Sequence, residues 1–356
     1  MSEPYRRITV DAPAFRDELW TAVTGRDERA AIDVVLAALD SGLDAEAVLL
    51  DVIAAVQRRV GAEWAANTLS VADEHTATAI NDRAVTALAL YAAAAHPASA
   101  GRVTVACVDG EWHALPARLV AEVLRLRGWQ VDFLGAQVPT RHLIAHLHNT
   151  GPDAVLLSSS LPTRLPSAHG TITACQAAGV PVLVGGAAFG PGGRYADLLG
   201  ADAWAPDAAS AAELLARGLR PEQQPPDRPH RTLPHLTDQE FTMITRSTPH
   251  LLATTMAELE HHFPAMRGYS ELQLERTAED IAQILEFLAT ALYLDDDELF
   301  AGFVTWTAGV LSARAVPAQS LFPVLDLLGG QLQDFPRARR ILTAATDALT
   351  GTARIA

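Results

Sequence analysis

The feature that most constrains the fold of this chain is an alternation of short strand-like runs with amphipathic helical segments between residues 102 and 218. Strands that are separated by helices pair as a parallel sheet with right-handed crossovers. Ligands of such sheets bind beyond the carboxyl ends of the strands. We therefore expect an α/β domain over residues 101–220, with its site in the loops that follow the strands. The strand-like runs are Val103–Val108, Val131–Leu134, Ala154–Leu157, Val182–Val184 and, more weakly, Ala201–Ala205.

A helical pattern precedes this domain. Over residues 14–96 the apolar side chains recur every three or four positions, which predicts a four-helix bundle. The run from His96 to Gly101 contains proline and glycine and breaks the periodicity, so we expect the bundle to end there. Examples of the apolar spacing are Ile32, Val35, Leu36 and Leu39.

A second helical region follows the α/β domain. Residues 221–236 are rich in proline and predict a stiff linker. Beyond the linker, residues 237–356 show helical periodicity and no strand pattern, which predicts an all-α domain. The clearest helical segments are Glu271–Leu294, Asp297–Ala313 and Gln319–Leu332. The expected fold class is α/β plus all-α.

Composition excludes several functions. The chain has no lysine, so all 27 basic residues are arginine, which rules out chemistry that needs a Schiff-base or P-loop lysine. The net charge is −15 and the basic residues form no block, so we expect no direct DNA binding. Because no apolar run reaches the roughly 18 residues of a membrane span and no signal-peptide pattern is present, we expect a cytoplasmic protein without a membrane segment. Cys107 and Cys175 are too few for a disulfide framework and are expected to be buried.

Three strand ends carry residues suited to a ligand site. Glu111 and His113 follow the first strand, Ser159 follows the third, and Gly185 and Gly186 follow the fourth. A neutral imidazole is a good metal ligand, and a nearby carboxylate fixes its tautomer. Paired glycines let a backbone approach closely. Each feature alone is also typical of an ordinary loop, turn or strand end, but their order on alternating strand ends favours a common site.

These residues resemble the signature of the flavodoxin-like (Rossmann-type) cobalamin-binding domains. That signature is an acidic residue, a spacer, a histidine, two spacers and a glycine, followed by Ser-x-Leu and Gly-Gly. The resemblance implies that His113 is the lower axial ligand of cobalt and that Glu111 orients it. It also implies that Ser159, Leu161, Gly185 and Gly186 line a slot for the nucleotide base of the cofactor. Pro116 stands where the family usually has glycine.

The helical bundle resembles the cap of adenosylcobalamin-dependent photoreceptors of the CarH type. In that family a tryptophan is followed seven, ten and eleven residues later by Val, Glu and His, and here these residues are Trp64, Val71, Glu74 and His75. The resemblance implies that they enclose the adenosyl group over the upper face of the corrin. Ala65 replaces a second histidine of the family, which leaves both water and His75 open as the ligand after photolysis. The family also places a DNA-binding domain ahead of the bundle, and we expect none here.

The order of domains resembles photocobilins, in which a cobalamin photoreceptor unit is joined to a globin-like domain that binds biliverdin. A bilin needs an apolar cleft, cations for its propionates and acceptors for its pyrrole N–H groups. Neither cysteine lies beyond residue 236, so a thioether link within this domain is excluded. A haem held by His261 or His262 stays open as an alternative. The candidate bilin-binding residues are His262, Arg267, Arg276 and Asp280, and each of them also fits a surface position.

The resemblances imply a light sensor and not an enzyme. Photolysis of the cobalt–carbon bond is expected to change the domain arrangement or the quaternary state of a homo-oligomer, and the signal is expected to pass to a downstream effector protein. The first alternative is a corrinoid methyl carrier of a methyltransferase system, which also pairs a helical bundle with this domain. The second is a haem or gas sensor that acts through the C-terminal domain. A mutase subunit is disfavoured because no barrel-sized substrate domain is present.

Overall fold

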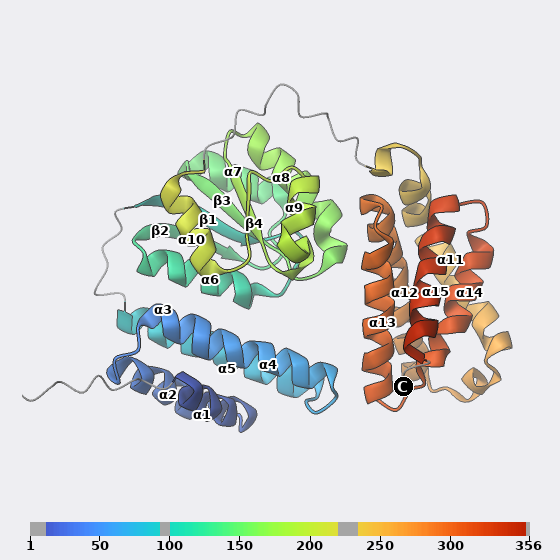
Figure 1. Cartoon of the computed structure of the whole chain (residues 1–356), viewed down its shortest axis with the longest axis horizontal. Helices are drawn as coiled ribbons and strands as arrows, with labels where there is room; N and C mark the ends of the chain where they lie inside the picture. Colours follow the sequence, from blue (N-terminus) through green and yellow to red (C-terminus); the bar gives the residue numbers. More distant parts are fainter. Residues whose placement is uncertain (1–11, 93–99, 220–233, 354–356) are drawn as a thin grey trace, which may run out of the picture. The chain divides into compact units, whose positions relative to one another are not determined.

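The computed structural model describes residues 12–92, 100–219 and 234–353 (Figure 1). Contacts divide the chain into two compact units. The first comprises residues 1–160 and 167–222, and the second comprises residues 161–166 and 223–356. The bundle and the α/β domain thus belong to one unit, whereas the C-terminal helices form the core of the other. Most of the predicted linker, at residues 221–233, lies outside the described residues.

The first unit begins with the predicted four-helix bundle. Its third helix is continuous, because the short helix α3 runs through a π-helical segment, η1, into α4. Asp27 caps α2 by accepting a hydrogen bond from the backbone N–H of Ala30 at 2.9 Å, as expected of an aspartate at a helix start. The elements are α1 (Ala12–Thr24), α2 (Glu28–Asp40), α3 (Ala45–Ala47), η1 (Val48–Ile53), α4 (Ala54–Ala65) and α5 (Val71–Ala92).

The α/β domain is a five-stranded parallel sheet of order β2-β1-β3-β4-β5. This order is that of the flavodoxin-like fold, whose ligand site lies where the winding reverses between β1 and β3. The predicted strands are confirmed to within two residues at each end. They are β1 (Gly101–Cys107), β2 (Trp129–Gly135), β3 (Ala154–Ser158), β4 (Val182–Gly185) and β5 (Ala203–Ala205).

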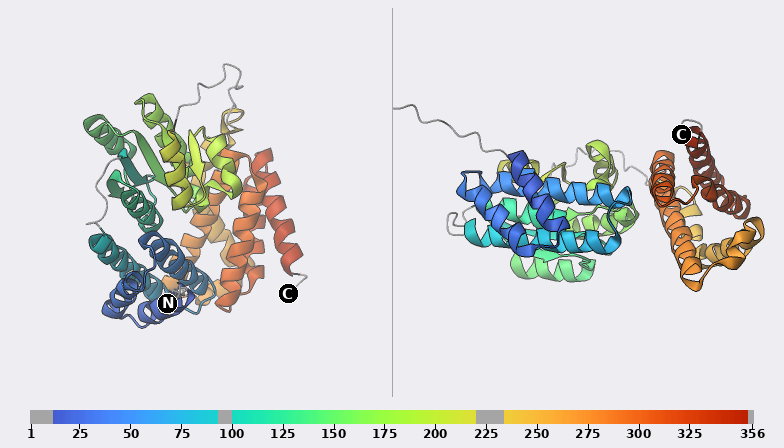
Figure 2. Two further views of the ribbon diagram at one scale, coloured as in Figure 1. Left: turned by 60° about the vertical axis from the view of Figure 1, so that its left-hand side comes forward. Right: turned by 90° about the horizontal axis from the view of Figure 1, so that it is seen from below.

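Helices cover both faces of the sheet (Figures 1 and 2). On one face α6 packs against α10. The neighbouring helices α7 and α8 are joined by a hydrogen bond of 2.7 Å between the hydroxyl groups of Thr140 and Thr171. The helices are α6 (Ala114–Leu126), α7 (Thr140–Thr150), α8 (Leu165–Ala177), α9 (Arg194–Leu198) and α10 (Ala208–Arg217), with 3-10 turns η3 (Pro162–Arg164), η4 (Ala187–Phe189) and η5 (Pro191–Gly193).

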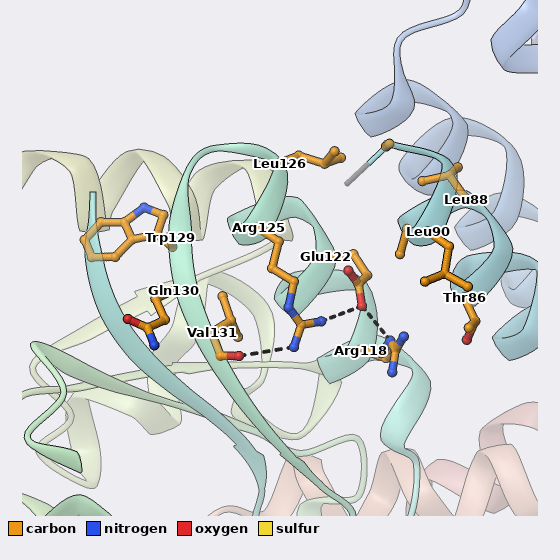
Figure 3. A pocket seen from close by; sticks show the side chains of 12 residues that line it. Thr86, Leu88, Leu90, Arg118, Glu122, Arg125, Leu126, Trp129, Gln130 and Val131 are labelled. Atoms are coloured by element: carbon orange, nitrogen blue, oxygen red, sulfur yellow. Dashed lines mark hydrogen bonds and ion pairs between the residues drawn. The ribbon is translucent and has the colours of Figure 1, made fainter. Parts of the chain in front are cut away.

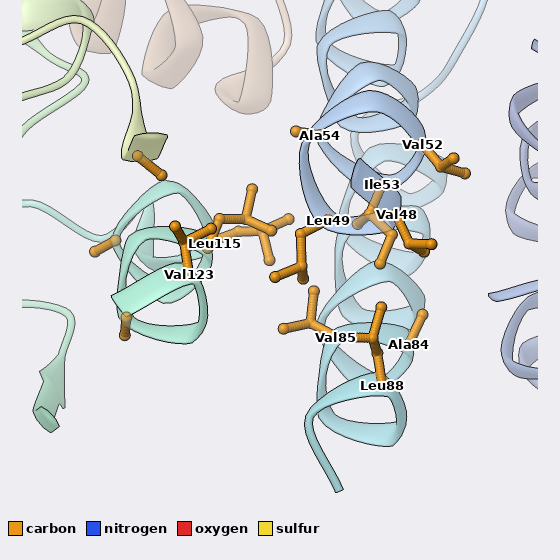
Figure 4. Close-up of a cluster of buried hydrophobic side chains, with 14 of the residues drawn as sticks. Val48, Leu49, Val52, Ile53, Ala54, Ala84, Val85, Leu88, Leu115 and Val123 are labelled. Atoms are coloured by element: carbon orange, nitrogen blue, oxygen red, sulfur yellow. The ribbon is translucent and has the colours of Figure 1, made fainter. Parts of the chain in front are cut away.

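The bundle packs against α6, so that the two predicted domains share one hydrophobic core. Leu49 of η1 and Val85 of α5 lie opposite Leu115 and Val123 of α6 (Figure 4). Directly after the last residue of α6, Arg127 forms a two-point ion pair with Glu46 of α3, and the closest contact between them is 2.6 Å. This pair raises the pKa of Arg127. The interface fixes the bundle beside the helix that follows the Glu111–His113 loop.

The second unit contains only helices among its described residues, as predicted. Ser270 and Gln273 form a capping box at the start of α12, and the side chains of Phe287 and Phe303 stack at 3.7 Å in its core. A globin packs eight helices, whereas residues 234–353 form five α-helices, so the globin-like description stays a prediction. The elements are η6 (Pro234–Leu236), α11 (Glu240–His262), η7 (Pro264–Gly268), α12 (Glu271–Leu294), α13 (Asp297–Ala313), η8 (Ala318–Ser320), α14 (Leu321–Gln331) and α15 (Pro336–Ala353).

None of the helices in the described ranges has both the length and the apolar character needed to cross a bilayer.

Candidate functional site

Glu111 and His113 form a carboxylate–imidazole pair in the loop between β1 and α6. Glu111 is fully buried, and its Oε1 lies 2.6 Å from Nδ1 of His113 and accepts the backbone N–H of the same residue at 2.9 Å. An ionised carboxylate can only accept, so the proton of the neutral imidazole lies on Nδ1. Nε2 then carries the lone pair. Because the His113 side chain is 44% exposed, this nitrogen can bind a metal from outside the loop.

The second oxygen of Glu111 ties this loop to the end of β3. Oε2 accepts the hydroxyl of Ser159 at 3.1 Å and the backbone N–H of Ser160 at 2.7 Å. The carboxylate therefore joins the two strand ends at which the winding of the sheet reverses. The predicted contact between Glu111 and His113 is present, and the structure adds the link to Ser159 and Ser160.

The paired glycines let the loop after β4 pack against the loop after β3. Gly186 has φ +99°, and a Cβ atom there would lie 2.2 Å from the backbone oxygen of Ser159. That oxygen accepts the N–H of Ala188 at 3.1 Å, and the Ser159 N–H donates to the oxygen of Gly185 at 3.1 Å. Position 186 thus needs glycine for both its conformation and its close contact.

A cavity of about 210 Å³ lies beside these strand ends. Its walls are mainly apolar and include Gly185 and Gly186, but neither Ser159, which is buried, nor Leu161, which is half-buried. Pro116, in the first turn of α6, lines it where the family signature has glycine. A flat aromatic base fits such an apolar slot between a sheet and a helix. The other lining residues come from the strands (Val105, Leu156, Leu157, Ser158, Leu183, Ala205), from the bundle (Leu50, Ala54, Arg58) and from α6 and α10 with its preceding loop (Ala117, Leu119, Val120, Pro206, Asp207, Ala208, Ala211).

Both cysteines are buried, as predicted. Burial and, second, the charge of Glu111 raise the pKa of Cys107 to about 12, and burial alone raises that of Cys175 to about 12. The two thiols are therefore protonated at neutral pH. Since the thiolate is the form that binds metals and attacks electrophiles, neither cysteine is suited to metal binding or nucleophilic attack.

One of the four predicted cap residues, His75, lies close to the His113 loop. Glu74 and His75 lie in the first turn of α5, with 2.7 Å between Glu74 Oε2 and His75 Nδ1. The ring of His75 meets the edge of Trp112 at 6.3 Å between centroids, and Trp112 meets His113 at 5.1 Å. Trp64 is half-buried at the end of α4, and Val71 is 58% exposed at the start of α5.

Trp112 is a site residue that the sequence did not indicate. It occupies the spacer position between Glu111 and His113, and its large side chain is 55% exposed. The signal that could have found it is the placement of an aromatic residue inside a loop motif. Its contact with His75 depends on the fold, because the two residues are far apart in the sequence.

A larger cavity, of about 450 Å³, lies between α5, α6 and β2 (Figure 3). Glu122 is buried in its wall and forms ion pairs with Arg118 at 2.8 Å and Arg125 at 2.6 Å. Arg125 also donates to the backbone oxygen of Val131 at 3.2 Å. None of the residues predicted for the cobalt site or the cap lines this cavity.

The candidate bilin residues of the second unit are exposed. His262 Nδ1 lies 3.0 Å from the backbone oxygen of Glu258, as is common at a helix end. Arg267 pairs with Glu260 at 3.7 Å, and Arg276 pairs with Glu279 at 2.6 Å. Two cavities of this unit, of about 570 and 660 Å³, are lined by other residues and not by His262, Arg267, Arg276 or Asp280.

Comparison with known proteins supports the interpretation of the first unit. Residues 101–216 match the model of a B12 binding domain, and residues 15–89 match a second B12 binding domain model. The dimethylamine corrinoid protein 3 of Methanosarcina mazei is 31% identical over 124 residues, which cover 33% of this chain and 73% of that protein.

Two repressors of Myxococcus xanthus are also similar. The HTH-type transcriptional repressor CarA is 30% identical over 200 residues, covering 52% of this chain and 66% of the repressor. The HTH-type transcriptional repressor CarH is 32% identical over 189 residues, which cover 50% of this chain and 59% of that repressor. This chain spans 57 to 73% of the length of the first curated relatives that it matches.

The fold of the first unit is that of a solved corrinoid protein. The monomethylamine corrinoid protein of Methanosarcina barkeri aligns with a TM-score of 0.51 and 20% identity, covering 58% of this chain and 99% of that one. At this identity the likeness concerns the fold alone. Together with the two domain matches, the 31% identical corrinoid relative and the Glu111–His113 pair at the switch point of the sheet, it supports one conclusion: the chain belongs to the family of cobalamin-binding proteins that carry B12 binding domains.

Proposed function

We propose that this protein is a light sensor that binds adenosylcobalamin, with His113 as the lower axial ligand of cobalt. The observation that carries the proposal is the row of three rings formed by His75, Trp112 and His113. It brings the cap pair Glu74–His75 to the loop that carries the cobalt ligand. A corrin bound by His113 would therefore have the cap at its other face.

On the lower side, Glu111 prepares His113 for metal binding. It accepts a hydrogen bond from the Nδ1 N–H of His113 and leaves the Nε2 lone pair for cobalt, as carboxylates do for many metal-binding histidines. The cavity of about 210 Å³ beside Gly185 and Gly186 would hold the nucleotide base that His113 displaces. The donor set and the glycine-lined slot thus fit the cofactor.

On the upper side, the bundle supplies the contacts that distinguish an adenosyl group. Trp64 and Val71 offer apolar surface, and Glu74 and His75 offer polar atoms at the junction of α4 and α5. Bound adenosylcobalamin supplies a cobalt–carbon bond that visible light breaks. Loss of the group would remove its contacts with these residues, and the core shared by η1, α5 and α6 would pass the change to the unit as a whole.

The similarity to CarA and CarH supports a cobalamin-based light sensor. We propose a homo-oligomer with different states in darkness and light, whose signal goes to another protein. We propose that the protein is not an enzyme, because photolysis of the cofactor supplies the signal and a change in protein packing transmits it. The net charge of −15 argues against direct contact with DNA phosphates.

The test is to load the protein in darkness with adenosylcobalamin and to record absorption spectra and size-exclusion profiles before and after green light. We expect a spectral change that marks loss of the adenosyl group, together with a shift in elution. The same protein loaded with hydroxocobalamin is the control and should elute identically in both conditions. An unchanged spectrum and elution of the adenosyl form would contradict the photosensor.

A corrinoid methyl carrier is the second candidate, because dimethylamine corrinoid proteins match the same region. A carrier must expose its upper ligand to methyltransferases, whereas the cap residue His75 contacts Trp112 of the His113 loop. The candidates differ in ligand preference. A sensor should bind adenosylcobalamin more tightly than methylcobalamin, and a carrier should not.

We also propose that the second unit binds biliverdin non-covalently. A cavity of about 570 Å³, lined by α13, η8 and α14, has the size of a small-molecule pocket, and Thr305, Ser312 and Gln319 offer acceptors among apolar walls. No arginine or histidine lines it, so the cations that pair with the propionates would have to come from outside this lining. Co-expression with a haem oxygenase should give a protein that absorbs in the red and releases its pigment in acid. A haem spectrum instead would favour the gas-sensor alternative. A purified protein without any pigment would contradict both biliverdin binding and haem binding.

A further inference from the structure

A chain of polar side chains runs through the bundle and ends at His75. Glu74, Thr78 and Asn81 lie on one face of α5, and Gln57 lies opposite them on α4. Asn81 Nδ2 donates to Gln57 Oε1 at 2.8 Å, and Gln57 Nε2 donates to Thr78 Oγ1 at 2.7 Å. The Thr78 hydroxyl donates to Glu74 Oε1 at 2.8 Å. The other oxygen of Glu74 lies 2.7 Å from Nδ1 of His75.

Chemistry fixes the direction of every hydrogen bond in this chain. An ionised Glu74 can only accept, so Thr78 must give it its single hydroxyl proton. The Thr78 oxygen must then accept from the amide nitrogen of Gln57, which leaves the Gln57 oxygen for the amide nitrogen of Asn81. Because each amide has one allowed orientation, Glu74 is held in one rotamer. By the same argument, neutral His75 carries its proton on Nδ1 and its lone pair on Nε2.

Packing alone does not explain why Asn81 is present. Its side chain is fully buried in the bundle core, and its Oδ1 has no hydrogen-bond partner among the described residues. An apolar residue would avoid the cost of that desolvated amide oxygen. What Asn81 contributes is the donor that fixes Gln57. Polar residues that break the local pattern of a core are a mark of functional sites.

The π-helical segment η1 lies directly before the helix that carries Gln57. A π turn inserts one extra residue and so rotates the following helix by about 100° relative to an unbroken α-helix. In this protein the rotated helix presents Gln57 to Thr78 of α5. Sequence periodicity gives no sign of this, since the apolar residues Val48, Val52 and Val56 keep ordinary helical spacing.

We propose that Asn81, Gln57 and Thr78 are positioning residues that hold Glu74, and through it His75, ready to contact the adenosyl group. The inference rests on the proposed adenosylcobalamin cofactor. The Glu74–His75 pair, at the end of this hydrogen-bond network, has the same arrangement as the proposed cobalt ligand, where Glu111 Oε1 lies 2.6 Å from Nδ1 of His113. At His75 the Nε2 lone pair is left as an acceptor, and the adenosyl group offers amine and hydroxyl donors.

The first test needs no cofactor. Nitrogen-15 NMR of the histidine rings in the cofactor-free full chain, at a pH where they are neutral, reports the tautomer of His75. The native protein and Thr78→Ser, which keeps the hydroxyl, should show the proton on Nδ1. Thr78→Val has the same shape without the hydroxyl and should give a mixture of tautomers. An identical tautomer in all three proteins would overturn the proposal.

The second test compares affinities for adenosylcobalamin and hydroxocobalamin. Thr78→Val and Gln57→Met should weaken binding of the adenosyl form about tenfold, as loss of a supporting contact typically does, and leave hydroxocobalamin unchanged. Thr78→Ser should restore the preference. If the native protein prefers the adenosyl form and both variants keep that preference, the positioning role is wrong. If the native protein has no preference, the proposed function itself fails, and the inference fails with it.

Discussion

At the scale of single residues, the candidate site was predictable where its signal is local and not where it depends on tertiary contact. Glu111 and His113 are two residues apart, so their spacing indicated the pair that the structure shows at 2.6 Å. Ser159 was indicated by its position after a strand. Trp112 and Gln57 were not, because their partners His75 and Thr78 lie on other helices. The spacing of residues along the sequence does not indicate contacts between different elements.

The first prediction concerns the proposed cobalt ligand. His113→Ala should lower cobalamin affinity by more than the 10–100-fold that is typical of a lost supporting contact, because it removes the metal-binding atom itself. Equilibrium titration followed by absorption measures the effect. His142→Ala, at an exposed position of α7, is the control and should bind normally. Equal affinity of the two variants would remove His113 from the site.

The second prediction concerns Glu111, whose two oxygens each accept two hydrogen bonds. In Glu111→Gln the amide nitrogen must face a backbone donor, that of His113 or of Ser160, whichever way it points. We expect a loss of about 1–3 kcal/mol in the free energy of unfolding, in addition to weaker cobalamin binding. Chemical denaturation of the cofactor-free protein checks the first part. Unchanged stability would mean that the loop does not need the carboxylate.

At the scale of elements, helices and strands with a clear period were predicted closely, and irregular ones were not. The helix Glu271–Leu294 was predicted to the residue, since its apolar stripe is regular and Ser270 caps it. The helix Glu240–His262 contains Pro249, which usually breaks a helix, yet burial of Ile244, Leu251 and Leu259 maintains it. The π segment η1 was also missed, because the four-residue spacing of Val48, Val52 and Val56 is compatible with both α-helical and π-helical turns.

The third prediction tests the packing of the loop after β4. Gly186→Ala forces a Cβ atom to within 2.2 Å of the Ser159 oxygen, so the loop must move, and we expect loss of cobalamin binding. Gly200→Ala is a matched control, because Gly200 also has a positive φ, of +74°, but has open space at its Cβ. It should cost about 1–2 kcal/mol from its backbone conformation alone and bind cobalamin normally. Normal binding by Gly186→Ala would show that the glycine pair does not shape the slot.

The fourth prediction concerns the start of α5. Hydrogen bonds from the side chain of Ser70 and then from Arg26 lower the pKa of Asp73 to about 2. The ordinary value of the unfolded chain is about 4, so the charged form stabilises the fold above that pH and this contribution is lost as the pH falls to about 2. Asp73→Asn should therefore lower the thermal unfolding temperature at neutral pH and match the native protein near pH 2. A constant difference at every pH would contradict this account, and Asp51→Asn controls for net charge.

At the scale of the molecule, the chain has fewer separate parts than its sequence suggests. The sequence predicted the bundle and the α/β domain as two domains, but one hydrophobic core runs from η1 and α5 through α6 to the sheet. The amphipathic face of α6 looks the same whether it covers a sheet alone or a sheet and a bundle. This shared core gives the cap a physical connection to the site, which the proposed light response requires.

The central claim is that a histidine of this chain, and not the base of the cofactor, is the lower ligand of cobalt. The most direct measurement is the electron paramagnetic resonance spectrum of bound cobalamin after one-electron reduction, in protein whose histidines carry nitrogen-15. Coordination by a labelled imidazole splits each cobalt line into a doublet, and His113→Ala should abolish that doublet. Triplets from the natural nitrogen of the cofactor base, or a doublet that persists in His113→Ala, would contradict the account.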